Sequence, residues 1–454
     1  MQLDRTIFHP EYKPEPYWWE AARPSTDYSA NLPRETEIFV IGSGYSGLSA
    51  ALELAKEGRS VTVVDALAFG EAASSRNGGG VSAGVNIGKG ISGGPGQSNR
   101  SDSLLSGLLS ESAAAFEFIS TLIQREGIKC HFEKRGRFVG AVTPDHFDGM
   151  KEKVETLNRT IQIGAKIVPK VDQRREIGSD FYYGGMTIER AGKLHPALLH
   201  KGMLNACHRA GVTLCAHCRV EQIGGSVGKF QIQTTEGDCR AEQVIVATNG
   251  YTGDLTPKLR RRIVPISSQI IATEEIPEDL ALELIPNGRT ISESPRVTSY
   301  YRLLPGDRRV MYGGRARFEN VHPDVSATLL YQMMTDRWPQ LQGVRITHSW
   351  SGFVAMTVDA LPHMGQEDGL YYCTGCNGSG VAMMTHLGRQ VAQRIMQGDQ
   401  PVSAYENLNF QKVPVPFYTG NPWFLPIIGN YYRYLDNRER RRAVRSEIDR
   451  QGQS

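Results

Sequence analysis

The chain of 454 residues carries 51 basic and 48 acidic side chains, a near balance that gives no support to a nucleic-acid-binding protein. Its 40% of hydrophobic residues are typical of a globular protein, and its length is enough for two domains with their own cores. No apolar stretch approaches the roughly 18 residues that a membrane-spanning helix needs, and no secretory signal is visible at the start. We therefore expect a cytoplasmic protein whose seven cysteines stay reduced.

The clearest predicted elements lie in the first part of the chain. Residues 1–29 are rich in prolines and aromatic side chains, which predicts an ordered but irregular arm. Predicted strands at 37–41 and 60–65 flank a predicted helix at 47–57, and together they form one βαβ unit. Helical spacing of apolar residues predicts three further helices, at 104–126, 147–163 and 193–210.

The rest of the chain continues to alternate strands with helices. A hairpin is expected over 299–313, with its turn at Pro305, Gly306 and Asp307. A strand, a glycine-rich turn and a helix follow over 371–396, and a basic helix lies in the tail at 438–445. The alternation predicts an α/β fold. Three more strands are expected, at 213–223, 230–234 and 243–247.

A glycine-rich hexapeptide directly follows the first predicted strand and opens the first predicted helix. Its glycines permit a tight turn, a close approach to a pyrophosphate and close packing of the helix on its strand. The helix N-terminus then faces the negative charge. Asp65, 18 residues after the hexapeptide, would bind both hydroxyls of an adenosine ribose, which favours FAD or NAD over NADP. The hexapeptide is Gly42, Ser43, Gly44, Tyr45, Ser46 and Gly47.

A second segment of small residues lies shortly after the second predicted strand. It consists of Ser74, Ser75, Arg76, Asn77, Gly78, Gly79 and Gly80. Small residues permit close contact with a flat ring or a phosphate, which favours FAD over NAD. The two motifs resemble the D-amino acid oxidase superfamily, in its branch of glycine, sarcosine and γ-glutamylputrescine oxidases. The resemblance spans about 30–410, and the tail at 418–433 is similar to the γ-glutamylputrescine oxidase-like subgroup.

The resemblance implies a Rossmann-type FAD-binding domain built from discontinuous segments, and a mixed-sheet substrate domain. It also implies that a helix N-terminus near 375–381 faces the flavin pyrimidine, where its dipole would stabilise the reduced flavin anion. The expected FAD-binding segments are 30–100, 187–262 and 350–410, with the substrate domain at 101–186 and 263–349 and a tail at 411–454. Beyond the two motifs and Asp65, the expected FAD-binding residues are Ala66, Val220, Thr248, Asn249, Gly352, Gly375, Gly378, Ser379, Gly380 and Val381.

Two departures from the family pattern bear on the chemistry. Sarcosine oxidases attach their flavin through a cysteine, and the corresponding position here is Gly352, so we expect non-covalent FAD. Glycine and D-amino acid oxidases bind the substrate carboxylate with an arginine where this chain has Val354. Since a bidentate arginine–carboxylate pair is strong, its loss favours an amine whose carboxylate lies further from the flavin.

Three residues are candidates for catalytic roles. By resemblance, Tyr301 and Arg302 lie on a strand that faces the flavin ring, although both could be ordinary sheet residues. His363 follows Pro362 beside the flavin-edge motif, and it either handles a proton or is a hydrogen-bonded structural histidine.

Two groups of cysteines have spacings that suggest other chemistry. Cys215, His217 and Cys218 could form part of a zinc site, but strand alternation would place Cys218 on the face opposite to the other two, so we expect no metal. Cys373 and Cys376 form a C-x-x-C pair that is either a redox pair or small-residue packing beside the flavin.

The favoured hypothesis is an FAD-dependent oxidase of a γ-glutamyl polyamine or a similar amine. A neutral amine would pass a hydride to the flavin, water would hydrolyse the resulting imine, and oxygen would become hydrogen peroxide. One alternative is a dehydrogenase of pipecolate, sarcosine or a D-amino acid that passes electrons to a quinone or carrier, with the basic tail at a membrane. Another is a non-catalytic flavin-binding subunit. The oligomeric state is left open.

Overall fold

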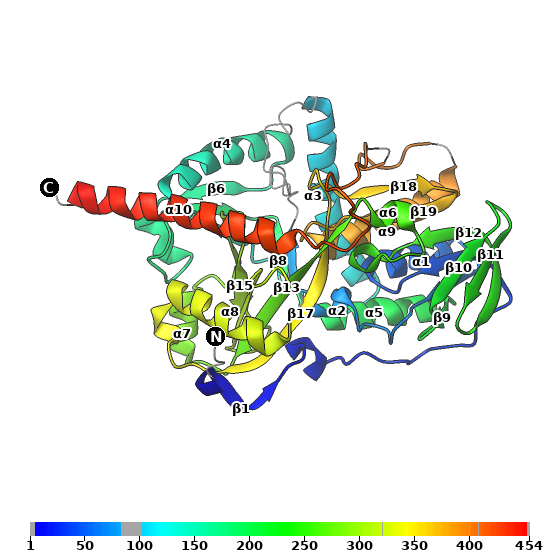
Figure 1. Ribbon diagram of the computed structural model, residues 1–454, viewed down its shortest axis with the longest axis horizontal. Helices are drawn as coiled ribbons and strands as arrows, with labels where there is room; N and C mark the ends of the chain where they lie inside the picture. Colours follow the sequence, from blue (N-terminus) through cyan, green and yellow to red (C-terminus); the bar gives the residue numbers. More distant parts are fainter. Residues whose placement is uncertain (1–4, 83–101, 320, 399, 407, 452–454) are drawn as a thin grey trace.

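The fold is organised around two large β-sheets that stand next to each other (Figure 1). The computed structural model describes residues 5–82, 102–319, 321–398, 400–406 and 408–451. Within these residues one sheet has nine strands and the other has eight, and both contain parallel and antiparallel pairs. The predicted α/β fold with mixed sheets is confirmed. A separate pair of short strands is formed by β4 (Gly80–Ser82) and β8 (Ala191–Lys193).

The eight-stranded sheet contains the predicted βαβ unit. Strands β2 and β3 pair in parallel, with Ile38 opposite Val61, and β12 pairs in parallel on the other side of β2. The central part of this sheet is buried on both faces, which explains its continuous apolar runs. Its strands are β2 (Glu35–Ile41), β3 (Val61–Val64), β9 (Thr213–Cys215), β10 (Val220–Gly224), β11 (Phe230–Thr234), β12 (Gly237–Val246), β18 (His363–Glu367) and β19 (Leu370–Thr374).

The nine-stranded sheet runs in the order β1-β17-β13-β16-β15-β14-β5-β7-β6. The hairpin predicted over 299–313 is confirmed as β15 and β16, an antiparallel pair at the centre of this sheet. The strands of the nine-stranded sheet are β1 (Phe8–Lys13), β5 (Arg137–Gly140), β6 (Ala165–Val168), β7 (Gly185–Ile188), β13 (Val264–Thr273), β14 (Thr290–Glu293), β15 (Tyr300–Leu303), β16 (Val310–Gly314) and β17 (Ile346–Met356).

Helices pack against both sheets. Helix α1 packs against α9 and against β3, while α8 packs on β13 and β17 of the larger sheet. The predicted helices at 104–126, 147–163 and 193–210 are confirmed as α3, α4 and α5. The helices are α1 (Tyr45–Lys56), α2 (Ala73–Arg76), α3 (Asp102–Arg125), α4 (Pro144–Ile161), α5 (Pro196–Arg209), α6 (Pro257–Arg260), α7 (Glu278–Leu284), α8 (Pro323–Arg337), α9 (Gly380–Gln397) and α10 (Leu425–Gln451).

The N-terminal arm is more regular than its composition suggested. Residues 8–13 form β1, which pairs in parallel with β17 at the edge of the nine-stranded sheet. The expectation of a wholly irregular arm is therefore wrong for this stretch. Pro10 does not prevent the pairing, because a proline is tolerated on an edge strand where one side needs no hydrogen-bond donor.

The stretch predicted as one strand over 213–223 is broken in two. Strand β9 ends at Cys215, His217 adopts a left-handed conformation with φ of 55°, and β10 begins at Val220. Because of this break, Cys218 packs in the same hydrophobic core as Cys215, while His217 is exposed. The prediction that Cys215 and His217 share one face of a strand and Cys218 lies on the other is therefore wrong. Among the described residues, no group of three or more His, Cys, Asp or Glu is placed to hold a metal ion.

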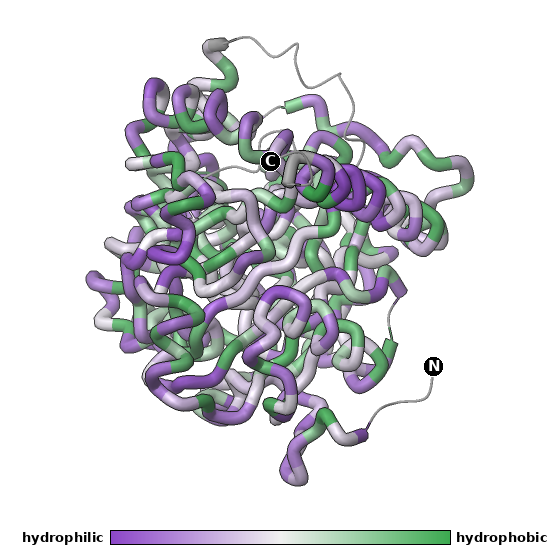
Figure 2. The backbone as a smooth tube through the Cα atoms, turned by 90° about the vertical axis from the view of Figure 1, so that its left-hand side faces the viewer, coloured by the Kyte–Doolittle hydropathy of each residue, from purple (hydrophilic) through white to green (hydrophobic). Residues whose placement is uncertain are grey.

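The C-terminal helix is much longer than the basic segment predicted at 438–445. It begins at Leu425 and projects beyond the body of the molecule, with the C-terminus at its far end (Figure 1). Figure 2 shows this helix mostly in purple, the colour of hydrophilic residues. None of the helices in the described part of the chain is long and apolar enough to span a membrane.

The two sheets do not divide the chain at the predicted domain boundaries. Strand β17 belongs along its whole length to the nine-stranded sheet, although the predicted FAD-binding segment begins at 350. Strand β7 likewise crosses the boundary predicted at 187. Parts of the expected segments, 1–4, 83–101 and 452–454, lie outside the described residues.

A close contact between α1 and α9 gives a test of this packing. A Cβ atom added at Gly388 would lie 2.2 Å from the carbonyl oxygen of Ser46. We expect Gly388→Ala to force the two helices apart and to lower the free energy of unfolding by about 1–3 kcal/mol. The measurement is the thermal unfolding midpoint of the FAD-loaded protein.

The matched control for this variant is Gly149→Ala in α4. Gly149 is exposed, and no heavy atom lies within 4 Å of an added Cβ. Alanine should stabilise this helix by up to about 1 kcal/mol, because glycine is the poorer helix former. A Gly388→Ala protein that melts at or above the wild-type midpoint would contradict the packing described here.

Candidate active site

One large cavity of about 1170 Å³ lies between the two sheets. Its walls come from the N-terminal turn of α1, the loop around α2, the turn before α9 and one face of β13, β15, β16 and β17. Segments far apart in the sequence therefore meet around a single space. The first turns of α10 close part of it through Leu425, Ile428 and Tyr432.

The predicted glycine motif forms the phosphate-binding end of this cavity. Gly42 has a φ of 105°, and a Cβ at Gly47 would lie 2.0 Å from the carbonyl oxygen of Gly42. These two glycines let α1 start directly after β2, with Gly44 as its N-cap. Gly44, Tyr45 and Ser46 line the cavity, where the first N–H groups of a helix have no partner within the helix. The arrangement suits a pyrophosphate.

Asp65 lies next to this turn at the end of β3. Its Oδ2 accepts hydrogen bonds from the N–H of Ser43 at 2.9 Å and from the Ser43 hydroxyl at 2.6 Å. Its Oδ1 accepts from the N–H of Leu67 at 3.0 Å. An ionised carboxylate has about four lone-pair sites, so acceptor sites are left for ribose hydroxyls. Ser43 itself is outside the cavity wall and fixes the orientation of Asp65.

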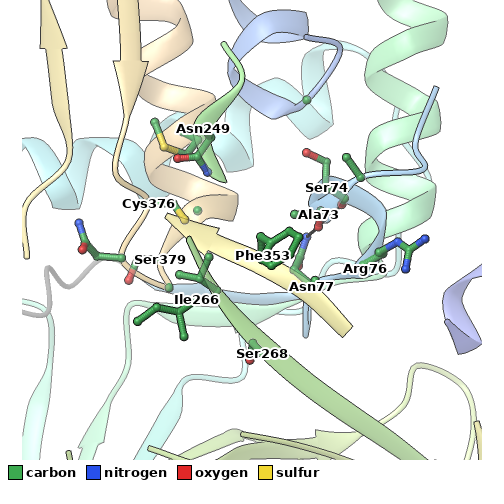
Figure 3. Close-up of a pocket in the computed structure, with 18 of the residues that line it drawn as sticks. Ala73, Ser74, Arg76, Asn77, Asn249, Ile266, Ser268, Phe353, Cys376 and Ser379 are labelled. Atoms are coloured by element: carbon green, nitrogen blue, oxygen red, sulfur yellow. Dashed lines mark hydrogen bonds between the residues drawn. The ribbon is translucent and has the colours of Figure 1, made fainter. Parts of the chain in front are cut away.

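The second predicted motif forms the loop around α2 and lies against α1. Asn77 links the loop together, because its Nδ2 donates to the carbonyl of Ser74 at 2.9 Å and its Oδ1 accepts from the N–H of Gly79 at 2.9 Å. The side chain of Arg76 points away from the cavity in Figure 3 and stacks 4.5 Å from the ring centre of Trp19. The loop therefore presents small residues and its backbone to the cavity.

Arg302 lies beneath this loop and is buried. Its Nη1 donates to the carbonyl oxygens of Gly79 at 3.1 Å and Leu194 at 3.0 Å. Its Nη2 is buried and has no hydrogen-bond partner among the described residues. Burial lowers the pKa of Arg302 to about 9. Arg302 thus holds the loop in place.

The remaining walls surround the space where a flavin ring would lie (Figure 3). Phe353 lies near Asn77 in this view, and Ile266 and Ser268 extend from β13 beside it. Asn249 accepts a hydrogen bond from the N–H of Gly375 at 3.1 Å, which fixes the turn that carries Cys376.

Most of the predicted FAD-binding residues line this cavity. Four of them lie outside the cavity wall and contact other residues of the site: Ser43, Ser75, Gly47 and Gly375. Their direct contact with FAD stays a prediction, as do the individual roles of the others. The predicted residues on the wall are Gly42, Gly44, Tyr45, Ser46, Asp65, Ala66, Ser74, Arg76, Asn77, Gly78, Gly79, Val220, Thr248, Asn249, Gly352, Gly378, Ser379, Gly380 and Val381.

The three predicted catalytic residues are not brought together. Tyr301 borders the cavity, but its hydroxyl donates to the Glu293 carboxylate at 3.3 Å within a buried network behind the sheet. His363 is outside the cavity wall, where it bonds Asp359 at 3.1 Å and stacks on Phe410. Arg302 lines the cavity, but its Nη1 is bound to carbonyl oxygens of Gly79 and Leu194. Catalytic roles for all three residues stay predictions.

Five basic residues in the cavity wall were missed by the sequence reasoning, namely Arg137, His146, Arg219, Arg296 and Arg315. Arg296 pairs with two carboxylates of α10, and His146 bonds the hydroxyl of Ser294. Arg315 and Arg137 have no carboxylate within ion-pair distance among the described residues. No local sequence signal marks them, because they come from loops and strands that meet only through long-range sheet pairing.

Arg315 reaches across the sheet toward the flavin end of the cavity. Its Nη2 contacts the sulfur of Met356 at 3.6 Å, and a thioether is a weak acceptor. Met356 lies two residues beyond Val354 on β17 and therefore shares its face of the strand. The guanidinium thus lies near the position where the family places its carboxylate-binding arginine. Burial lowers the pKa of Arg315.

The cavity fits FAD by the chemistry of its walls. The helix N-terminus suits a pyrophosphate, Asp65 keeps acceptor sites for a ribose, and glycines leave space beside the ring position. Added Cβ atoms at Gly78 would meet the ring of Tyr300 at 2.8 Å, and at Gly44 the hydroxyl of Ser74 at 3.1 Å. These two glycines therefore let neighbouring segments of the wall pack closely together.

Comparison with known proteins agrees with this fit. Residues 37–394 match the family model DAO, described as FAD dependent oxidoreductase. The chain belongs to this family. It is therefore an FAD-dependent oxidoreductase, as the two glycine motifs predicted.

Curated relatives cover most of the chain. It is 32% identical over 385 residues to the gamma-glutamylputrescine oxidoreductase of Escherichia coli strain K12, covering 83% of this chain and 88% of that protein. It is 31% identical over 415 residues to the probable oxidoreductase OrdL of Haemophilus influenzae, with 88% and 92% covered. The predicted family branch is confirmed. The chain is also 22% identical over 372 residues to the glycine oxidase of Geobacillus kaustophilus. The names of these relatives describe enzymes that act on an amine or an amino acid, or oxidoreductases without a stated substrate.

Solved structures confirm the fold. The crystal structure of glycine oxidase from Geobacillus kaustophilus superposes with a TM-score of 0.69 at 19% identity, covering 84% of this chain and 100% of that one. L-proline dehydrogenase from P. horikoshii gives 0.67 at 18% identity, with 87% and 98% covered.

A buried histidine beside Arg302 predicts a loss of stability in acid. His195 is 5% exposed, and its Nδ1 caps α5 by accepting from the N–H of Leu198 at 3.2 Å. Burial and the neighbouring Arg302 and His131 lower its pKa from 6.5 to about 4. Below pH 6.5 the unfolded chain binds this proton while the folded protein does not, so stability falls as the pH drops from 6.5 toward 4. The full effect is about 3 kcal/mol.

The matched variant is His195→Asn, which keeps a capping oxygen but cannot be protonated in this range. Its unfolding midpoint should fall less than that of the wild type between pH 7 and pH 5. Equal acid sensitivity of the two proteins would show that His195 is not responsible.

Proposed function

We propose that this protein oxidises the carbon–nitrogen bond of an elongated amine that carries a carboxylate, of the γ-glutamyl polyamine type, with oxygen as the final acceptor. The observation that supports this most is the shape and charge of the cavity. It continues beyond Gly352 and Ser268, across β16, β15 and β14, to a basic far end at Arg137. A small amino acid would leave most of this length unused.

The 32% identity to gamma-glutamylputrescine oxidoreductase over 88% of that protein supports the same substrate class. Val354 also fits it, because an amine without a nearby carboxylate needs no arginine on β17. The first turns of α10, in the tail that resembles the same subgroup, form part of the cavity wall.

The reaction balances with oxygen and water as the other reactants. The amine R–CH2–NH2 loses a hydride from carbon and a proton from nitrogen, oxygen takes up both to become hydrogen peroxide, and water converts the imine to an aldehyde and ammonia. Bound FAD supplies the hydride acceptor. The neighbouring guanidinium of Arg315 helps by disfavouring the protonated amine, because a like charge lowers an amine pKa. We propose that FAD is held non-covalently, since Gly352 offers no thiol.

A second candidate is a dehydrogenase or oxidase of an amino acid such as pipecolate, sarcosine or a D-amino acid. The observation that favours it is Arg315, whose guanidinium lies near Val354 and could receive an α-carboxylate. In that case electrons could pass to a quinone or carrier instead of oxygen.

The test starts with the purified yellow protein. Acid precipitation should leave the flavin colour in the supernatant if FAD is non-covalent. Anaerobic addition of γ-glutamylputrescine should then bleach the flavin absorbance, whereas sarcosine, pipecolate and D-alanine should bleach it slowly or not at all. Admission of air should restore the colour and yield one equivalent of hydrogen peroxide.

The control is the same titration with γ-glutamyl-n-butylamide, which lacks the amine to be oxidised. Bleaching by D-alanine, sarcosine or pipecolate alone would contradict the proposed substrate. Bleaching by γ-glutamylputrescine without peroxide in air would contradict oxygen as the acceptor.

A further inference from the structure

Arg137 lies at the end of the cavity that is furthest from the expected flavin ring. It is the first residue of β5, and it lines the cavity. Its Nε and Nη2 donate to the hydroxyl of Ser292 on β14, at 2.8 and 2.5 Å. Since β14 is one strand closer to the flavin, the guanidinium points back along the cavity.

In the described part of the chain, no acidic side chain compensates the positive charge at this end of the cavity. None of the described residues offers Arg137 a carboxylate within 4 Å, and its guanidinium donates two hydrogen bonds to the neutral hydroxyl of Ser292. Lys153 on α4 lies close enough for its own pKa to be lowered, first by burial and then by Arg137. Burial lowers the pKa of Arg137 to about 10. A half-buried cation without a carboxylate partner carries a desolvation cost, and an anionic ligand would reduce that cost.

The other basic residues of the cavity wall differ from Arg137 in their partners, their exposure or their position. Arg302 is bound through Nη1 to the carbonyl oxygens of Gly79 and Leu194, and its Nη2 is fully buried. His146 bonds Ser294 and lies 3.5 Å from a carboxylate oxygen of Glu439, and Arg219 is exposed. Arg296 is neutralised by Asp436 and Glu439 of α10. Arg315 lies at the flavin end, next to Met356. Arg137 is therefore the cation available to a group that is remote from the reacting carbon.

The distance along the sheet matches an elongated substrate. Ser268 pairs with Gly352 beside the flavin position, and four strand spacings separate β13 from β5, or about 19 Å at about 4.8 Å each. The arginine side chain reaches back by about 6 Å, which leaves about 13 Å. In γ-glutamylputrescine nine bonds separate the carbon bearing the free amine from the carboxylate carbon, or about 11 Å at about 1.25 Å per bond.

We propose that Arg137, oriented by Ser292, binds the distal carboxylate of the substrate and so selects amines that carry an acidic group about 11 Å from the oxidised carbon. This inference rests on the proposed amine oxidation and adds to it the residue that determines specificity. The substrate then spans the cavity, with its amine at the flavin and its acidic end at β5.

The test compares two substrates that differ only in the carboxylate. N-glutarylputrescine and N-pentanoylputrescine have the same length, but the first ends in a carboxylate and the second in a methyl group. The FAD-loaded wild-type enzyme should bleach with an apparent affinity about 10- to 100-fold higher for the glutaryl compound, as expected for a charge-assisted hydrogen bond. Arg137→Gln should reduce this ratio to near one.

Two further variants complete the experiment. Arg135→Gln is the matched control, because Arg135 is exposed and two residues away on the same segment. It should keep the wild-type ratio. Arg137→Lys keeps the charge but loses the forked geometry, and its ratio should fall between those of the wild type and Arg137→Gln.

The outcomes separate this inference from the proposed function. Equal affinities of the wild type for the two compounds would overturn it, and so would loss of the preference in Arg315→Gln but not in Arg137→Gln. If no amine bleaches the flavin, the proposed function fails, and the perturbation of the flavin spectrum by γ-glutamyl-n-butylamide still tests Arg137. Weaker binding of that compound by Arg137→Gln, but not by Arg135→Gln, would support the carboxylate site on its own.

Discussion

The contact between Gly47 and Gly42 is the constraint on which the rest of the site depends. No side chain fits there, because a Cβ at Gly47 would lie 2.0 Å from the carbonyl oxygen of Gly42. The contact allows α1 to begin directly at the end of β2, so that its N-terminus faces the cavity. It also sets α1 at the height where Ser46 meets Gly388 of α9. Helix α9, which also begins at the cavity, is therefore positioned by its contact with α1.

The larger sheet supplies the other wall, and a buried ionic network behind it holds its strands in register. Glu293 of β14 is fully buried and forms two hydrogen bonds with Arg337 of α8, at 2.8 and 2.9 Å. The hydroxyls of Tyr182 and Tyr301 donate to the same carboxylate. Removing one partner of such a pair would leave a buried charge without compensation. Ser292, the residue before Glu293 on β14, accepts the hydrogen bonds from Arg137 on the cavity side.

The parts of the site that could be predicted from sequence depend on short-range geometry. The turn at Gly42–Gly47 and the acid at Asp65 follow from a strand, a turn and a helix that are adjacent in the chain. The basic residues Arg137 and Arg315 could not be predicted in this way, since only the pairing of distant strands brings them to one cavity. The first turns of α10 were missed because a helix was predicted only over the basic segment at 438–445. Pro426 lies in the first turn of α10, where proline is tolerated.

The Gly42–Gly47 turn sets the position of the FAD site, and titration of the apoprotein with FAD tests this dependence. Gly47→Ala should bind FAD at least about 100-fold more weakly than the wild type, or about 3 kcal/mol, because α1 must move away from β2. Gly80→Ala, which has open space around an added Cβ at the cavity wall, should bind FAD with nearly wild-type affinity. A folded Gly47→Ala protein with wild-type affinity for FAD would show that the turn does not set the position of the site.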